Sequence, residues 1–246
     1  ELRSGFPYRV PHADALAELL AALIETAQPK KGIITDLDDT LWSGILGEDG
    51  VAAISWDQPA STIHGVYQQF LSALSERGVF VGVASRNDPG LVDDVFRRPD
   101  LLLSRDRVHP VRATWGAKSE SVRDILHAWN VAADSVVFVD DSPLELAEVQ
   151  AAHPGIECVL FRKDDPQDVW LLLERLRDLF GKPIISEADR LRVASLRDRA
   201  EVPDAPAGAA ADEFLGQIGA AGTIDYRKNA SDARPLELVN KTNQFN

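Results

Sequence analysis

The segment Lys31–Trp42, KGIITDLDDTLW, contains the pattern that decides the fold. Its first half is a short apolar run, and its second half carries three carboxylates within four residues, Asp36, Asp38 and Asp39. A continuous apolar run of this kind is typical of a parallel strand that is buried on both faces. Clustered carboxylates at the end of a buried strand are costly unless a cation neutralises them. The segment therefore predicts a buried strand that ends beside a positively charged group.

Apolar strands and amphipathic helices alternate along the chain after this segment. This alternation predicts an α/β fold in which a doubly wound parallel sheet lies between two layers of helices, a three-layer α/β/α architecture. Besides the first strand, the apolar runs predict strands at Val79–Ser85, Asp100–Ser104, Ser135–Asp141 and, at an edge, Gly155–Phe161.

The chain divides into three parts by pattern. Residues 31–185 are predicted to be the catalytic domain, and residues 1–30 an N-terminal helical segment that packs on its core. Residues 186–246 are predicted to be a helical appendage or the start of a further domain. Between Trp42 and Ile63 there is room only for a small hairpin flap with a turn at Asp49–Gly50, and not for a large cap.

Composition limits the possible partners. The chain has 246 residues and a net charge of −13, which opposes general binding to nucleic acid or an anionic membrane. No apolar run reaches the roughly 18 residues that span a bilayer. The single cysteine, Cys158, excludes an internal disulfide, and with no visible signal peptide it predicts a cytoplasmic location. An anionic substrate must then be met by local cations or a metal.

Polar residues end three of the apolar runs, and a lysine opens an intervening helix. Ligands of doubly wound sheets bind beyond the C-terminal ends of the strands, so these side chains are expected to meet at one edge. Carboxylates at this density predict Mg²⁺, and a lysine with a hydroxyl beside the metal can hold phosphoryl oxygens. The set consists of Asp36, Asp38, Ser85, Lys118, Asp140 and Asp141.

Four blocks resemble the motifs of haloacid dehalogenase (HAD)-type phosphotransferases in their usual order. The longer block at 36–50 and the terminal NKTNQFN are similar to FkbH-like proteins, the glyceryltransferase/phosphatases of polyketide biosynthesis. The four blocks are DLDDT (36–40), VASRN (83–87), WGAKS (115–119) and FVDDSP (138–143).

The resemblance implies a role for most of these residues. Asp36 would be the nucleophile that forms an aspartyl-phosphate, and Asp38 the acid and then the base. Ser85 and Lys118 would hold the phosphoryl oxygens. Arg86 and Asn87, which follow Ser85, are further candidates for substrate binding. The implied Mg²⁺ ligands are Asp36, Asp38 through its carbonyl, Asp140 and Asp141.

The FkbH-like resemblance also implies a substrate and a partner. The glyceryl unit of 1,3-bisphosphoglycerate would be loaded on the phosphopantetheine thiol of an acyl carrier protein, with loss of the remaining phosphate. Many members of this family have a cysteine where this chain has Ala84. Cys158 is a poor substitute for it, so the expectation is either that transfer goes directly to the carrier thiol or that the transferase activity is absent.

Three other functions would use part of the same pattern. A plain small-molecule phosphatase would use the same residues without acyl transfer. A phosphorylation-switched module of the response-regulator kind would place its lysine on the last strand, whereas Lys118 precedes the final acidic pair. A non-catalytic module that only binds a carrier protein would not need all four blocks intact.

Overall fold

The computed structural model describes residues 12–17, 20, 29–59 and 61–181. Residues 12–17 and 20 are helical, as the sequence predicts for part of the N-terminal segment. The other residues of that segment before Pro29, and the predicted appendage at 186–246, lie outside the described residues. No described helix is both long enough and apolar enough to cross a membrane.

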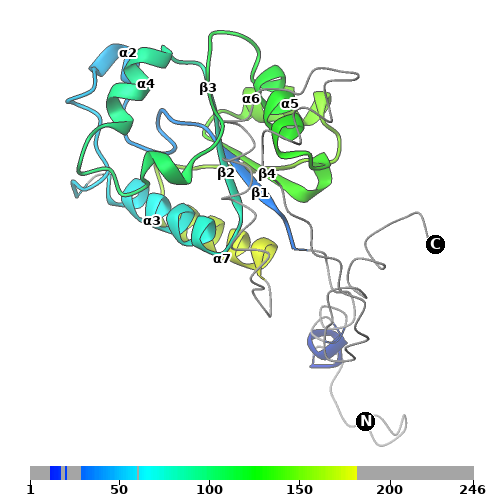
Figure 1. Ribbon diagram of the computed structural model, residues 1–246. Coiled ribbons are helices and arrows are strands. Elements are labelled where there is room, and N and C mark those ends of the chain that lie inside the picture. Colours follow the sequence, from blue (N-terminus) through cyan, green and yellow to red (C-terminus); the bar gives the residue numbers. More distant parts are fainter. Residues whose placement is uncertain (1–11, 18–19, 21–28, 60, 182–246) are drawn as a thin grey trace, which may run out of the picture. The chain divides into compact units, whose positions relative to one another are not determined.

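A five-stranded parallel sheet forms the centre of the fold, as predicted (Figure 1). The strands lie in the order β3-β2-β1-β4-β5, so β1 and β4 are neighbours although two strands separate them in the chain. The order reverses direction between β1 and β4, which makes their C-terminal ends the topological switch point. The strands are β1 (Gly32–Thr35), β2 (Phe80–Ser85), β3 (Val111–Ala113), β4 (Val136–Asp140) and β5 (Glu157–Leu160).

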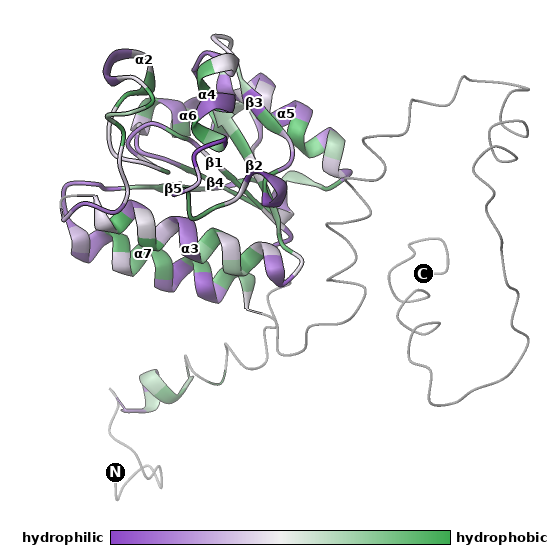
Figure 2. Cartoon of the chain, turned by 60° about the vertical axis from the view of Figure 1, so that its left-hand side comes forward, coloured by the Kyte–Doolittle hydropathy of each residue, from purple (hydrophilic) through white to green (hydrophobic). Residues whose placement is uncertain are grey.

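Helices cover both faces of the sheet, which completes the predicted three layers (Figure 1). Helices α3 and α7 lie side by side on one face, and α5 and α6 on the other. Figure 2 shows hydrophobic strands between helices that mix hydrophobic and hydrophilic residues. The helices are α2 (Leu46–Asp49), α3 (Thr62–Glu76), α4 (Pro89–Phe96), α5 (Lys118–Trp129), α6 (Pro143–Ala152) and α7 (Pro166–Phe180).

Successive residues of β1 point to opposite faces, so each face has its own core. Ile33 belongs to the core beneath α3 and α7, and Ile34 to the core beneath α5 and α6. On the second face the indole of Trp129 lies against glycines of two adjacent strands, Gly32 and Gly82. The absence of a side chain at both positions lets α5, which begins at Lys118, approach the sheet closely.

One predicted strand is wrong. Residues Asp100–Ser104 form no strand, and the edge of the sheet is instead β3, which the sequence did not predict. Leu101 and Leu103 pack on the core from a loop. Leu103 is fully buried, and its backbone N–H donates to the side chain of Gln68 at 3.4 Å.

The insert between Trp42 and α3 is small, as predicted, but it is built differently from a two-residue hairpin. Ser43 and Ser55 form a single antiparallel pair, and the short helix α2 lies between them. Arg98 fixes this insert from outside. Its guanidinium donates to the carbonyls of Val51 and Ile54 at 2.7 and 3.1 Å and lies 4.2 Å from the ring centroid of Trp56.

Replacing Gly82 with alanine tests the packing of α5 on the sheet. The added Cβ would stand 2.8 Å from Cζ2 of Trp129, so the ring must shift. We expect the free energy of unfolding, measured by urea denaturation, to fall by about 1–3 kcal/mol, the usual cost of overpacking a core. Gly47→Ala is the control, because its Cβ would meet nothing within 4 Å. Equal stability of the two variants would contradict this packing.

Candidate active site

Two carboxylates lie at the switch point of the sheet. Asp36 directly follows β1, and its backbone N–H donates to the carbonyl of Val139 in β4 at 2.9 Å. Asp140 is the last residue of β4. The parallel pairing of β1 with β4 therefore brings the two side chains to the same edge, where doubly wound folds bind their ligands.

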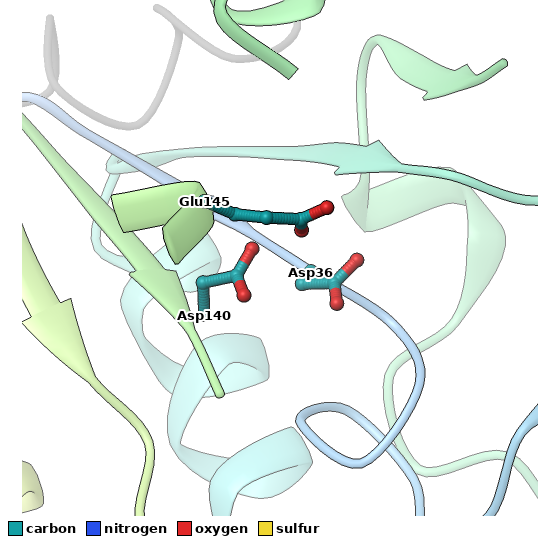
Figure 3. Close-up of side chains that lie close together, drawn as sticks. All are labelled: Asp36, Asp140 and Glu145. Atoms are coloured by element: carbon teal, nitrogen blue, oxygen red, sulfur yellow. The ribbon is translucent and has the colours of Figure 1, made fainter. Parts of the chain in front are cut away.

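The ammonium group of Lys118 lies among three carboxylates. Its Nζ atom is 3.0 Å from Oδ1 of Asp36, 2.6 Å from Oδ2 of Asp140, and also in contact with Glu145. Figure 3 shows the three carboxylates close together, and they come from the end of β1, the end of β4 and the first turn of α6. Lys118 is 3% exposed, so water contributes little to balancing these charges.

Burial and mutual repulsion perturb the pKa values of this cluster. Burial raises the pKa of Asp36 to about 6, against the opposing effects of Lys118, the backbone of Leu37 and the hydroxyl of Ser85. Burial and the charge of Asp36 raise the pKa of Asp140 to about 7. Burial alone would lower the pKa of Lys118, but Asp36 and Asp140 outweigh it and the pKa is raised. One ammonium is thus too little positive charge for these carboxylates.

The cluster fits a divalent cation. One ligand oxygen from each of Asp36, Asp140 and Glu145 can be chosen so that all lie within 4.8 Å of one another. Oδ1 of Asp36 is buried and, apart from its ion pair with Lys118, has no hydrogen-bond partner within the described part of the chain. Three carboxylates and one ammonium leave a formal charge of −2, which one Mg²⁺ would balance, and oxygen ligands are those that Mg²⁺ prefers.

Glu145 is the residue of this cluster that sequence reasoning missed. It follows Asp140 by five positions and lies in the first turn of α6, which begins at Pro143 with Ser142 as its N-cap. An acidic residue in a first helical turn is common because it favours the helix dipole. Its position in the sequence could have identified it as a site residue. Side chains in the first turn of a helix that directly follows a strand point back toward the C-terminal end of that strand.

The carboxylate of Asp38 does not join the cluster. Oδ1 accepts hydrogen bonds from Nε1 of Trp42 at 2.9 Å and the backbone N–H of Leu46 at 3.1 Å. Oδ2 accepts a hydrogen bond from Nδ2 of Asn87 at 2.9 Å. Its predicted role as a metal ligand through the backbone carbonyl stays a prediction.

Asp141 also lies outside the three-carboxylate cluster. Its Oδ2 is 3.8 Å from Nζ of Lys163, which bonds in addition to Asp39. Asp39 adopts a left-handed backbone conformation, with φ of 54°, and accepts a hydrogen bond from the N–H of Gly44 at 3.0 Å. Lys163 therefore joins the loop after β5 to the turn after β1.

The three site residues predicted at the end of β2 differ in their surroundings. Ser85 and Asn87 are buried, and Nδ2 of Asn87 lies 3.4 Å from Oγ of Ser85. Arg86 is half-exposed and pairs with Glu145 at 3.3 Å and with Glu148 at 3.0 Å. The hydroxyl of Ser85 also interacts with the carboxylate of Asp36, which places Ser85 at the cluster, whereas Arg86 contacts the cluster through Glu145.

Cys158 is not part of the site. It lies in β5, pairs in register with Phe138 of β4, and donates its thiol hydrogen to the carbonyl of Leu146 at 3.6 Å. Burial and the charge of Glu157 raise the pKa of its thiol to about 11. A thiol with this pKa is a weak nucleophile at neutral pH, which agrees with its prediction as a poor acyl acceptor.

Comparison with solved structures connects this geometry to phosphatases. The chain is similar to the N-terminal part of a Bacteroides fragilis protein that contains a phosphatase domain and was crystallised in complex with Mg. The two share 29% sequence identity with a TM-score of 0.59, over 68% of this chain and 44% of that chain. This chain thus spans less than half of the length of that structure.

Two further solved structures are more distant. A cobalt-bound deoxy-D-mannose-octulosonate 8-phosphate phosphatase from Haemophilus influenzae is 18% identical, with a TM-score of 0.44 over 63% of this chain and 91% of its own. A HAD-superfamily hydrolase from Ehrlichia chaffeensis is 14% identical, with a TM-score of 0.43 over 63% of this chain and 100% of its own. No protein-family model matches the sequence, and no curated protein is significantly similar to it.

Replacing Lys118 with methionine tests the charge balance of the cluster. Loss of one partner from a buried ion pair usually costs about 3–5 kcal/mol, so we expect the metal-free variant to lose about 3 kcal/mol of unfolding free energy. Excess Mg²⁺ should restore part of this loss, because a bound cation replaces the missing charge. Denaturant melts with and without Mg²⁺ measure both effects.

Lys163→Met is the matched control for this substitution. It removes a lysine that also pairs with two carboxylates but is 37% exposed, so we expect a cost of about 1 kcal/mol or less and no added response to Mg²⁺. Equal losses in the two variants would contradict the account of the cluster.

Proposed function

We propose that this chain is a Mg²⁺-dependent phosphatase of the HAD type that acts through an aspartyl-phosphate on Asp36. The observation that carries the proposal is the cluster at the switch point, where Asp36, Asp140 and Glu145 surround Lys118 with Ser85 beside them. The similarity to a Mg-complexed phosphatase domain at 29% identity supports the same chemistry.

In the first step, a carboxylate oxygen of Asp36 bonds to phosphorus while the bond from phosphorus to the ester oxygen breaks. The bonding electrons leave with the ester oxygen, which takes a proton from Asp38 and departs as the alcohol. The ammonium of Lys118 and the hydroxyl of Ser85 donate hydrogen bonds to the phosphoryl oxygens. Bound Mg²⁺ would neutralise the charge that opposes attack of one anion on another.

In the second step, Asp38 takes a proton from water as the water oxygen bonds to phosphorus. The bond between phosphorus and Asp36 breaks, and its electrons restore the carboxylate. Inorganic phosphate leaves, so the sum of the two steps is hydrolysis of one phosphate ester by one water molecule.

The nucleophile and the metal can be tested together. We expect Asp36→Asn to lower phosphate release from small phosphate esters by about 10³-fold or more, because an amide cannot form the acyl-phosphate bond. We expect EDTA to abolish the activity of the unmodified protein and Mg²⁺ to restore it. Phosphate release is measured with a colorimetric assay.

The control for this variant is Asp94→Asn, the same substitution at an exposed residue of α4 that pairs with Arg97. It should leave the activity unchanged. Full activity of Asp36→Asn, or activity that EDTA leaves unchanged, would contradict the proposed function.

We further propose the specific form that the FkbH-like resemblance implies, in which the phosphatase site serves glyceryl transfer to an acyl carrier protein. A carrier thiol attacks the acyl-phosphate carbon of 1,3-bisphosphoglycerate, the C–S bond forms, and phosphate leaves with the thiol proton. The remaining phosphate is then hydrolysed at Asp36. A plain small-molecule phosphatase is the alternative.

Two observations bear on this finer form. The thiol of Cys158 donates its hydrogen bond to the carbonyl of Leu146 and has a raised pKa, which supports a thiol supplied by the carrier. The small insert leaves a site that no large cap covers within the described residues, which suits a substrate attached to a protein.

Intact-protein mass spectrometry decides between the two forms. A phosphopantetheinylated carrier protein is incubated with this chain, Mg²⁺ and 1,3-bisphosphoglycerate generated in place. We expect a glyceryl adduct on the carrier, and with Asp36→Asn either no adduct or one that keeps its phosphate. Phosphate release that depends on Asp36 without any adduct would leave the plain phosphatase and exclude acyl transfer.

A further inference from the structure

The carboxylate of Asp38 is held by three hydrogen-bond donors from two segments. Trp42 and Leu46 belong to the segment that follows β1, and both donate to Oδ1, at 2.9 and 3.1 Å. Asn87 follows β2 and donates to Oδ2 at 2.9 Å. The side chains of Trp42 and Asn87 are 0% and 1% exposed. Donors that are themselves fixed by packing determine the orientation of the carboxylate.

The number of donors differs between the two oxygens. Each carboxylate oxygen has about two positions at which it can accept a hydrogen bond. Oδ1 accepts from the indole of Trp42 and the backbone of Leu46, whereas Oδ2 accepts only from Asn87 among the residues that the structure describes. Oδ2 is therefore the oxygen that can carry a proton while all three hydrogen bonds remain.

The segment that supplies two of these donors is itself tied to the core. Nε2 of Gln68 in α3 donates to the carbonyl of Leu41 at 2.8 Å, next to Trp42. Arg98 bonds to two carbonyls further along the insert, as described above. On the other side, Asn87 lies 3.4 Å from Oγ of Ser85, so it connects Asp38 to the predicted phosphate-binding hydroxyl.

We propose that Trp42 and Asn87 are positioning residues that hold Asp38 so that its Oδ2 faces the oxygen of the leaving group. This inference rests on the proposed phosphatase function, in which Asp38 transfers the proton. Asn87 then acts on Asp38 and not on the substrate, which differs from its role predicted from sequence. The insert serves as a fixed support for the Trp42 and Leu46 donors.

The dependence of the rate on the leaving group tests this positioning. A misplaced general acid lowers the rate of hydrolysis most when the departing oxygen needs a proton, as in β-glycerophosphate. It lowers the rate little when the oxygen leaves readily as an anion, as in 4-nitrophenyl phosphate. For Trp42→Phe and for Asn87→Ala we expect kcat/KM to fall about 100-fold with β-glycerophosphate and less than about fivefold with 4-nitrophenyl phosphate. The inhibition constant of inorganic phosphate should stay within about twofold, because binding is unaffected.

Trp56→Phe is the matched control. Trp56 is also buried in the insert and donates from Nε1, at 3.0 Å, to the carbonyl of Asp100, but that bond does not involve Asp38. The same chemical change there should leave the leaving-group dependence as it is in the unmodified protein.

Three outcomes are distinguishable. Equal losses with both esters in Trp42→Phe and Asn87→Ala would overturn the positioning role while the phosphatase function stands. An unmodified protein that hydrolyses neither ester with Mg²⁺ would overturn the proposed function and this inference with it. If Trp42→Phe does not fold, Asn87→Ala alone tests the positioning role, because it removes the hydrogen-bond donor to Oδ2 of Asp38.

Discussion

Three carboxylates compete for one buried ammonium at the centre of this molecule, and the rest of the site depends on that competition. Asp36, Asp140 and Glu145 all contact Lys118, which is almost fully buried. Removing charges from water costs several kcal/mol per ion, and one lysine cannot compensate three carboxylates. Burial raises the pKa values of Asp36 and Asp140 although Lys118 opposes the shift in both. A divalent cation resolves the shortage of positive charge, and a phosphate bound to that cation would add its own oxygens to the same centre.

Such a centre requires several chain segments to end at one point. The parallel pairing of β1 with β4 supplies two carboxylates, and the helices that follow bring Lys118 and Glu145 with their first turns. The left-handed backbone at Asp39 turns the chain sharply after β1. That turn sends Trp42 back to bond with Asp38. The site is thus built from backbone that the fold already fixes, which would limit the reorganisation needed for the proposed reaction.

The sequence predicted the fold better than the contacts that the side chains make at the candidate site. Strands buried on both faces are continuous apolar runs, so β1, β2 and β4 were visible. The short edge strand β3 contains the exposed Arg112, so its sequence shows no continuous apolar run. The apolar Leu101 and Leu103 suggested a strand, but they pack on the core from a loop. Partners separated in sequence, such as Asn87 with Asp38, leave no periodic signal. Glu145 was missed because an acidic first turn has an ordinary structural explanation.

The pairing of the cations has a consequence for how an anion would bind. Each cationic side chain that the structure places beside the site residues already contacts at least two carboxylates. These side chains are Lys118, Lys163 and Arg86. A chain with a net charge of −13 also repels an approaching phosphate at long range. Under the proposed function, phosphate binding would therefore depend on a metal that takes over the carboxylates and releases Lys118 for the phosphoryl oxygens. Metal binding and substrate binding would in this way be coupled by charge, and each should strengthen the other.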